Sequence, residues 1–182
     1  MKYTTAILAG ALTLATQPVI AQTTATGDTH AAFFGNLSRM CGATYEGASV
    51  FPQDPADQFA GKKLVATVAS CKANEIRIPF VVGADRSRTW IIRNDKAVLT
   101  LAHDHRHEDG TPDKQTMYGG LASAPGSALS QSFLADSYTA KLIPAAVTNV
   151  WTLTFSPDAS KMTYYLERDG KPRFKAELYR KP

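Results

Sequence analysis

From Gly42 to the end of the chain, apolar and polar residues alternate with a period of two, and this pattern most constrains the fold. Trp151, Leu153 and Phe155, for example, are each separated by one polar residue. Successive side chains of a strand point to opposite faces, so each such segment is expected to bury one face. The predicted strands cover residues 43–50, 63–71, 75–82, 88–94, 97–107, 114–119, 130–134, 139–142, 149–156, 161–168 and 173–179.

Short turns rather than long helices separate these segments. Asp109-Gly110 and Asp169-Gly170 are typical of tight hairpin connections. Parallel strands need long crossovers, so the sheet is expected to be antiparallel. Hairpins from start to end favour an up-and-down barrel, which also leaves no exposed edge. The sequence therefore predicts an all-β fold, an antiparallel up-and-down β-barrel of roughly 8–10 strands.

The first residues are typical of an export signal. Lys2 precedes an apolar stretch over residues 6–15, and residues 19–21 suit a signal peptidase. We therefore expect a signal peptide of residues 1–21, cleaved after Ala21. The apolar stretch is too short to cross a bilayer, which takes roughly 20 residues, and no other segment is longer. A periplasmic or secreted protein that does not span the membrane is the expected product.

The mature chain is expected to form one domain. Residues 22–28 are small and polar and predict a flexible leader. A short helix is expected from about His30 to Cys41, where Gly42 suits its end. Residues 29–182 have a usual length for a single core and are assigned to one β-barrel domain.

Two cysteines, Cys41 and Cys71, lie outside the predicted signal. In an oxidising compartment such a pair predicts a disulfide. A redox pair or thiolate metal ligands are the alternative, but neither a C-x-x-C spacing nor a second pair is present. The sequence therefore favours a structural bridge.

The net charge of +4 falls to near +3 once Lys2 is removed with the signal. Basic and acidic residues alternate along the chain, whereas a nucleic-acid-binding surface normally shows a dense basic stripe. No nucleic-acid partner is expected.

A histidine run carries the most specific chemistry of the chain. His103, His105 and His107 recur at every second position, and Leu99 and Leu101 share their parity. In a strand, all five side chains point to one face, which the leucines mark as the buried one. Imidazoles at the end of an apolar strand suggest the rim of a pocket for a small molecule. A hydrogen-bonded polar network is the alternative.

Zinc or copper binding is a further interpretation of this run. Imidazoles two residues apart lie roughly 6.5–7 Å apart and can share an ion, whereas the outer pair lies about 13 Å apart. A metal-binding protein or a metal-dependent hydrolase would thus use two of the three histidines and a ligand from another strand. Candidates for that ligand are Glu108, Asp136 and His30. In a network without metal, the partners would be Tyr118, Asp113 or Asp136.

Arg88, Trp90 and Ile92 form a second cluster on one strand face. The guanidinium is expected to stack on the indole or to close the end of the barrel by packing. Binding of the carboxylate or phosphate of a ligand is the alternative. Neither a G-x-S-x-G motif nor paired carboxylates are present, so no catalytic residue is assigned and enzymatic activity stays open. The predicted ligand-binding residues are His103, His105, His107, Arg88, Trp90 and Tyr118.

Four motifs together carry a resemblance. They are Cys-Gly-x-x-Tyr-Glu-Gly from Cys41, Asp-Arg-Ser-Arg-Thr-Trp from Asp85, His-Asp-His-Arg-His-Glu-Asp-Gly from His103 and Thr-Met-Tyr-Gly-Gly from Thr116. Over most of the mature chain this order resembles a family of secreted bacterial proteins of unassigned function. The resemblance implies export and a common fold, and it brings no reaction or cofactor. In architecture alone the strand pattern also resembles lipocalins and other calycin barrels, although their early G-x-W is absent.

Overall fold

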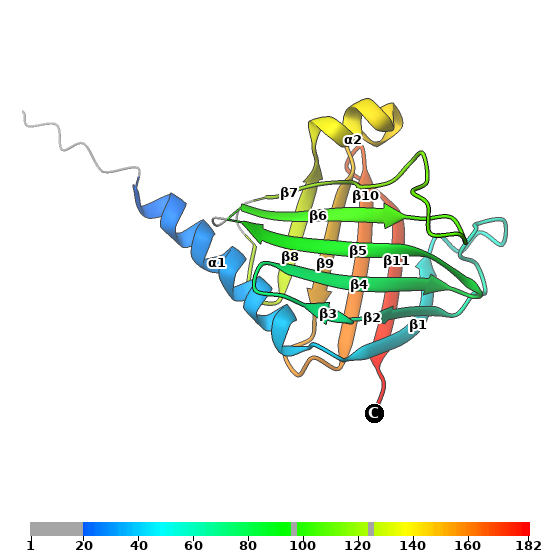
Figure 1. Cartoon of the computed structure of the whole chain (residues 1–182), viewed down its shortest axis with the longest axis horizontal. Helices are drawn as coiled ribbons and strands as arrows, with labels where there is room; N and C mark the ends of the chain where they lie inside the picture. The colour runs from blue at the N-terminus through cyan, green and yellow to red at the C-terminus, as the bar shows by residue number, and fades with distance from the viewer. Residues whose placement is uncertain (1–19, 96–97, 124–125) are drawn as a thin grey trace, which may run out of the picture.

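The computed structural model describes residues 20–95, 98–123 and 126–182. Within these residues, ten antiparallel strands close into a barrel, and one short strand, β3, lies outside it (Figure 1). The strands are β1 (Thr44–Phe51), β2 (Leu64–Thr67), β3 (Ser70–Cys71), β4 (Glu75–Val82), β5 (Asp85–Asp95), β6 (Val98–His105), β7 (Tyr118–Ala122), β8 (Ser130–Ala135), β9 (Val150–Phe155), β10 (Lys161–Arg168) and β11 (Lys171–Arg180).

Each barrel strand pairs with its neighbour in the chain, and two further pairings close the ring. β1 pairs with β11, and β2 pairs with β4 through Leu64↔Val82 to Ala66↔Phe80. β3 pairs only with β4 among the described strands. The predicted antiparallel up-and-down β-barrel is therefore confirmed.

The alternation along each strand produces the core. In β4, every second residue from Ile76 to Val82 is buried, and the residues between them are half-buried. Trp151, Leu153 and Phe155 do the same in β9. These residues belong to one continuous apolar cluster inside the barrel. The period of two therefore decides which side chains leave water.

Helix α1 (Ile20–Arg39) covers one end of the barrel. Phe33 and Leu37 are fully buried, and the Phe33 ring lies 6.3 Å from that of Phe155. In Figure 1, α1 crosses the left side of the barrel beside the end of β5 and the start of β6. The barrel is thus closed by apolar side chains of α1 at this end.

α1 is longer than the sequence analysis predicted. Residues 22–28, expected to be a flexible leader, are helical. Once the buried turns around Phe33 are formed, adding a residue at the N-terminal side costs little, and no proline interrupts residues 19–51. The predicted cleavage position after Ala21 lies in the first turn of α1, and residues 1–19 of the predicted signal lie outside the described residues.

The predicted strand at 139–142 is wrong, because these residues belong to helix α2 (Ser137–Leu142). Asp136 caps α2, and its side chain accepts a hydrogen bond of 2.7 Å from the backbone N–H of Thr139. A four-residue alternation is a weak strand signal, and the aspartate cap outweighs it. A short 3-10 helix, η1 (Pro144–Ala146), follows, and both lie near the end of the barrel that α1 leaves open.

Two adjacent glycines set the position of β7, which begins later than the predicted strand at 114–119. A Cβ atom on Gly119 would lie 1.9 Å from the carbonyl oxygen of Leu101, and one on Gly120 would lie 1.7 Å from that of Leu134. No side chain fits at either position. The two glycines therefore allow β6 and β8 to approach β7 closely.

A disulfide joins Cys41 to Cys71, which confirms the predicted bridge. It ties the chain just after α1 to β3, with a Cα–Cα distance of 6.1 Å. Among the helices of the described residues, none is long and apolar enough to cross a membrane.

We predict that replacing Cys41 and Cys71 together by serine lowers the free energy of unfolding by about 3–4 kcal/mol. The reason is that the unfolded chain regains the freedom that a closed loop of about 30 residues denies it. Urea unfolding monitored by circular dichroism measures the difference. The wild-type protein in a reducing agent should unfold at the same urea concentration as the double variant. Equal stability of oxidised and reduced wild type would contradict this account.

Candidate ligand cavity

The barrel holds a cavity of about 280 Å³ at the end opposite α1. Its wall comes from the ends of β4, β6 and β10, from the starts of β5, β7, β9 and β11, and from the segments that follow β1 and α2. Aromatic side chains supply most of the apolar lining, namely Phe59, Phe80, Trp90, Tyr118, Trp151, Tyr164 and Phe174.

His103 forms part of the cavity floor, where β6 pairs with β5 opposite Trp90. Its side chain is almost fully buried, with 4% exposed. Nδ1 lies 3.0 Å from the carbonyl oxygen of Tyr118, and Nε2 lies 2.8 Å from the hydroxyl of Tyr164. A carbonyl only accepts, so Nδ1 carries the proton and donates it. Burial lowers the pKa of His103 to about 3, and the neutral ring then accepts at Nε2 from the Tyr164 hydroxyl.

His105 lies one step nearer to the mouth and is half-buried. Its Nε2 lies 3.2 Å from the hydroxyl of Tyr118, and its backbone N–H donates to Oγ1 of Thr116 at 2.7 Å. Burial lowers the pKa of His105, and the positive charge of Arg88 lowers it further. The ring is therefore biased towards its neutral form.

The prediction that His107 shares this face is wrong. β6 ends at His105, and the backbone N–H of His107 donates instead to the carbonyl of Thr111. Gly110, with φ of 83°, turns the chain back at this point. His107 is exposed and faces a separate open groove outside the cavity.

The described residues contain no group of three or more histidine, cysteine, aspartate or glutamate side chains placed to hold a metal ion. Both ring nitrogens of His103 are occupied by hydrogen bonds. Of the predicted third ligands, Asp136 caps α2, His30 lies in α1, and Glu108 lines the same open groove as His107, outside the cavity. The hydrogen-bonded network with Tyr118, predicted as the alternative, is what the structure contains.

Stacked rings make up the wall around His103. Trp90 stacks on both Phe80 and Tyr164, with centroid distances of 4.4 Å to each ring. The imidazole of His103 stacks on Tyr118 at 4.7 Å, with an angle of 12° between the planes. Stacked aromatic pairs contribute about 0.5–1.5 kcal/mol beyond their buried area, so these contacts hold the wall in place.

Arg88 lies at the mouth, on the same strand face as Trp90, as its parity predicts. Its guanidinium contacts the ring of Phe59, 5.8 Å from the centroid, and pairs with the carboxylate of Asp85. Within the described residues, the guanidinium lies over the Phe59 ring and not over the Trp90 indole, so the predicted stacking on Trp90 does not occur.

Arg168 and Arg173 also line the mouth, and the sequence analysis missed both. Nε of Arg168 donates to Oδ1 of Asn149 at 2.8 Å, and Asn149 is buried. The hairpin signal at Asp169-Gly170 was the available clue. In an up-and-down barrel, the β10–β11 hairpin lies at the same end as the β4–β5 hairpin, and hence near Arg88.

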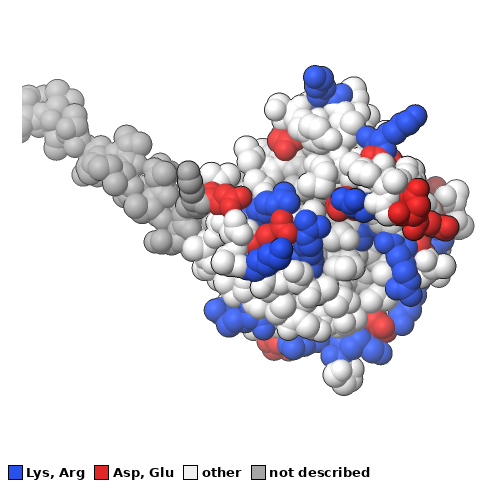
Figure 2. All heavy atoms as spheres, in the orientation of Figure 1, with Lys and Arg blue, Asp and Glu red and all other residues white. Residues whose placement is uncertain are grey.

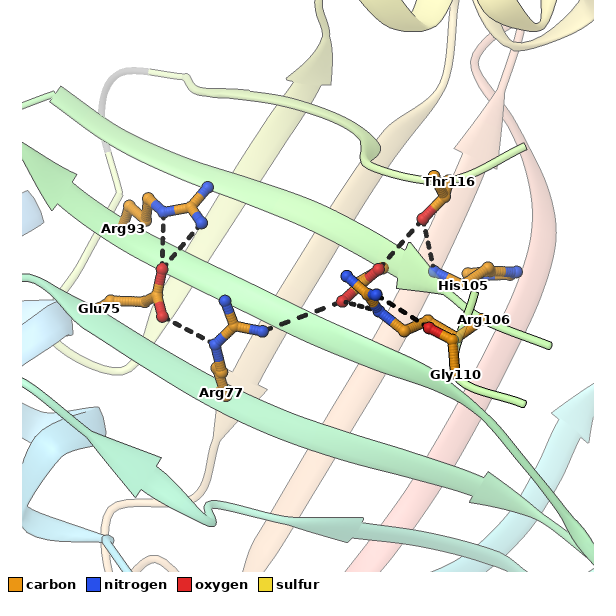
Figure 3. Close-up of polar contacts among 8 residues, drawn as sticks. Glu75, Arg77, Arg93, His105, Arg106, Gly110 and Thr116 are labelled. Carbon is orange, nitrogen blue, oxygen red and sulfur yellow. Dashed lines mark hydrogen bonds and ion pairs between the residues drawn. The ribbon is translucent and has the colours of Figure 1, made fainter. Parts of the chain in front are cut away.

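The outer face of β4–β6 carries a separate ionic network (Figure 3). Glu75 accepts hydrogen bonds from Arg77 at 2.7 Å and from Arg93 at 2.8 Å. Figure 2 shows the acidic and basic side chains of this face side by side.

Asp104 belongs to this network. It lies on the outer face of β6, yet only 5% of Asp104 is exposed. Arg106 donates to its carboxylate at 3.1 Å and the hydroxyl of Thr116 donates at 3.2 Å, because the chain before β7 folds over it.

No protein-family profile, curated protein or solved structure matches this chain. The resemblance to a family of secreted bacterial proteins, and the looser one to lipocalins, therefore stay predictions.

We predict that His103 makes the free energy of unfolding depend on pH in the acidic range. The unfolded chain takes up a proton at this residue below about pH 6.5, whereas the folded protein does so only near pH 3. The contribution of neutral His103 to the free energy of unfolding is therefore complete above pH 6.5. It is lost as the pH falls, at up to about 1.4 kcal/mol per pH unit. Between pH 6.5 and 4.5, wild type should lose about 2–3 kcal/mol more than His103→Gln.

Urea unfolding at both pH values measures this difference. The glutamine introduced by His103→Gln still presents a donor and an acceptor, and His107→Gln serves as the control because His107 is exposed. The control should keep the wild-type slope. A wild-type slope in His103→Gln would show that His103 is protonated in the folded protein.

Proposed function

We propose that this protein is an exported barrel that binds a small organic molecule in the cavity at its open end. The observation that carries the proposal is the aromatic cavity with a few fixed polar groups at its floor and mouth. Small-molecule sites usually combine a predominantly apolar lining with a small number of placed polar groups. Their volumes run from roughly 300 Å³ upwards, so a cavity of about 280 Å³ suits a small ligand.

The polar groups at the floor support binding without rearrangement. His103 is held between Tyr118 and Tyr164, and the stack of Phe80, Trp90 and Tyr164 fixes the neighbouring wall. A site whose side chains are already ordered loses little conformational entropy when a ligand enters. Both nitrogens of the buried His103 imidazole are engaged in hydrogen bonds, so the ring is not free to exchange a proton with a ligand. We therefore assign the cavity to binding rather than to acid–base chemistry.

Export is part of the proposal. The bridge between Cys41 and Cys71 fits an oxidising compartment such as the periplasm or the cell exterior. The predicted signal peptide would direct the chain there.

We predict that the neutral fluorophore N-phenyl-1-naphthylamine binds in the cavity. The chain has two tryptophans, Trp90 and Trp151, and both line this cavity. Bound fluorophore should therefore quench their emission by energy transfer. Leu166→Phe, which enlarges a lining side chain, should weaken binding by about tenfold, since excess volume at a packed wall costs roughly 1–3 kcal/mol.

The matched control is Leu134→Phe, the same change at a side chain on the outside of the barrel with 47% exposed. It should bind the fluorophore like wild type. Absence of quenching in wild type, or equal affinity in both variants, would show that the cavity does not take up small molecules.

A further inference from the structure

The mouth of the cavity is unevenly charged. Three arginines line it, namely Arg88, Arg168 and Arg173, and Asp57 is the acidic residue in the same lining. The carboxylate of Asp57 accepts a backbone hydrogen bond from Phe59 at 2.9 Å. The positive side chains therefore outnumber the carboxylate in this lining.

Arg88 is already neutralised, whereas the other two arginines are not. Asp85 pairs with Arg88. Within the part of the chain that the structure describes, no carboxylate lies within ion-pair distance of Arg168 or Arg173. Unpaired guanidinium groups at the edge of an apolar cavity attract an anion.

Arg168 is also oriented in advance. Its Nε donates to the buried Asn149, so the side chain is held at the cavity while its two Nη groups stay available. A planar guanidinium fork matches the two oxygens of a carboxylate. Arg173 lies on β11 across the hairpin from Arg168 and adds a second positive charge.

The total charge decides between classes of anion. Three arginines against Asp57 and Asp85 leave an excess of one positive charge. His105 adds none when neutral, as its lowered pKa favours. An excess of one charge matches a monoanion better than a doubly charged phosphate monoester.

We propose that the ligand is a small aromatic carboxylate, with its ring in the apolar cavity and its carboxylate at Arg168 and Arg173. This inference rests on the proposed binding function and names the class of ligand. The apolar body meets the aromatic lining, and the charge stays at the mouth, where water still reaches part of it. Burying the carboxylate at the floor instead would place it beside a neutral histidine and two tyrosines without a counter-charge.

Three probes that share one phenylpropenyl skeleton test the charge. Cinnamate is an anion, cinnamamide is neutral, and cinnamylamine is a cation, and isothermal titration calorimetry measures the affinity of each. Cinnamate should bind about tenfold more tightly than cinnamamide, since hydrogen bonds to charged groups are worth about that factor or more. Cinnamylamine should bind more weakly than both.

Substitutions at the two ends of one strand supply the matched control. Arg173→Gln removes a charge at the mouth, and Arg180→Gln removes one at the far end of β11. Arg173→Gln and Arg168→Gln should each weaken cinnamate severalfold and leave cinnamamide within twofold. Arg180→Gln should change neither affinity. Arg168→Lys keeps the charge but loses the fork, and it should fall between wild type and Arg168→Gln.

The outcomes separate the class of ligand from the binding function. Equal binding of cinnamate and cinnamamide, or tighter binding of cinnamylamine, overturns the carboxylate assignment and leaves a binding cavity. Loss of affinity in Arg180→Gln equal to that in Arg173→Gln shows a general charge effect and also overturns it. Failure of all three probes while N-phenyl-1-naphthylamine binds rejects aromatic carboxylates alone, and failure of that fluorophore as well rejects the binding function.

Discussion

The pairing of β2 with β4 is the constraint on which the rest of the structure depends, because it turns a meander into a closed barrel. Closure removes the two edges of the sheet and creates two open ends in their place. Apolar side chains at an open end must be covered or remain in contact with water. α1 covers one end with Phe33 and Leu37, and the disulfide between Cys41 and Cys71 holds the C-terminal end of α1 close to the sheet. The described residues place no such plug at the other end, so the cavity lies there.

Inside that cavity, one imidazole connects its own strand to a neighbouring strand and to a strand that is not a neighbour. His103 on β6 bonds to the backbone of Tyr118 on β7 and to the side chain of Tyr164 on β10, across the barrel. Three buried polar groups thereby satisfy one another, which avoids the cost of roughly 1–3 kcal/mol for each left unpaired. The same bonds leave His103 neutral and oriented. The floor of the otherwise apolar cavity therefore carries polar groups in fixed orientations and no charge.

Much of the fold is predictable from the sequence because strand parity is a local property. Trp90 and His103 were expected to face inwards, and both do. The prediction for His107 failed because the end of a strand depends on the following turn, which here begins two residues earlier than the alternation suggests. The burial of Asp104 is not predictable from its strand, because the chain that covers it, at Thr116, comes from outside that strand. Arg168 was missed because its position at the mouth depends on the closed topology rather than on its neighbours in sequence.

The cavity therefore has an apolar deep part and a charged mouth. The deep part of the cavity is made of stacked rings and a neutral histidine, which favour a flat apolar body and disfavour an ion. The charged groups lie at the mouth, where partial hydration reduces the cost of keeping Arg168 and Arg173 unpaired before a ligand arrives. The charged group of an anion at the mouth can pair with Arg168 and Arg173, and the ring of the same molecule can pack against the apolar wall. Both contacts are available together only to a molecule that carries its charge at one end.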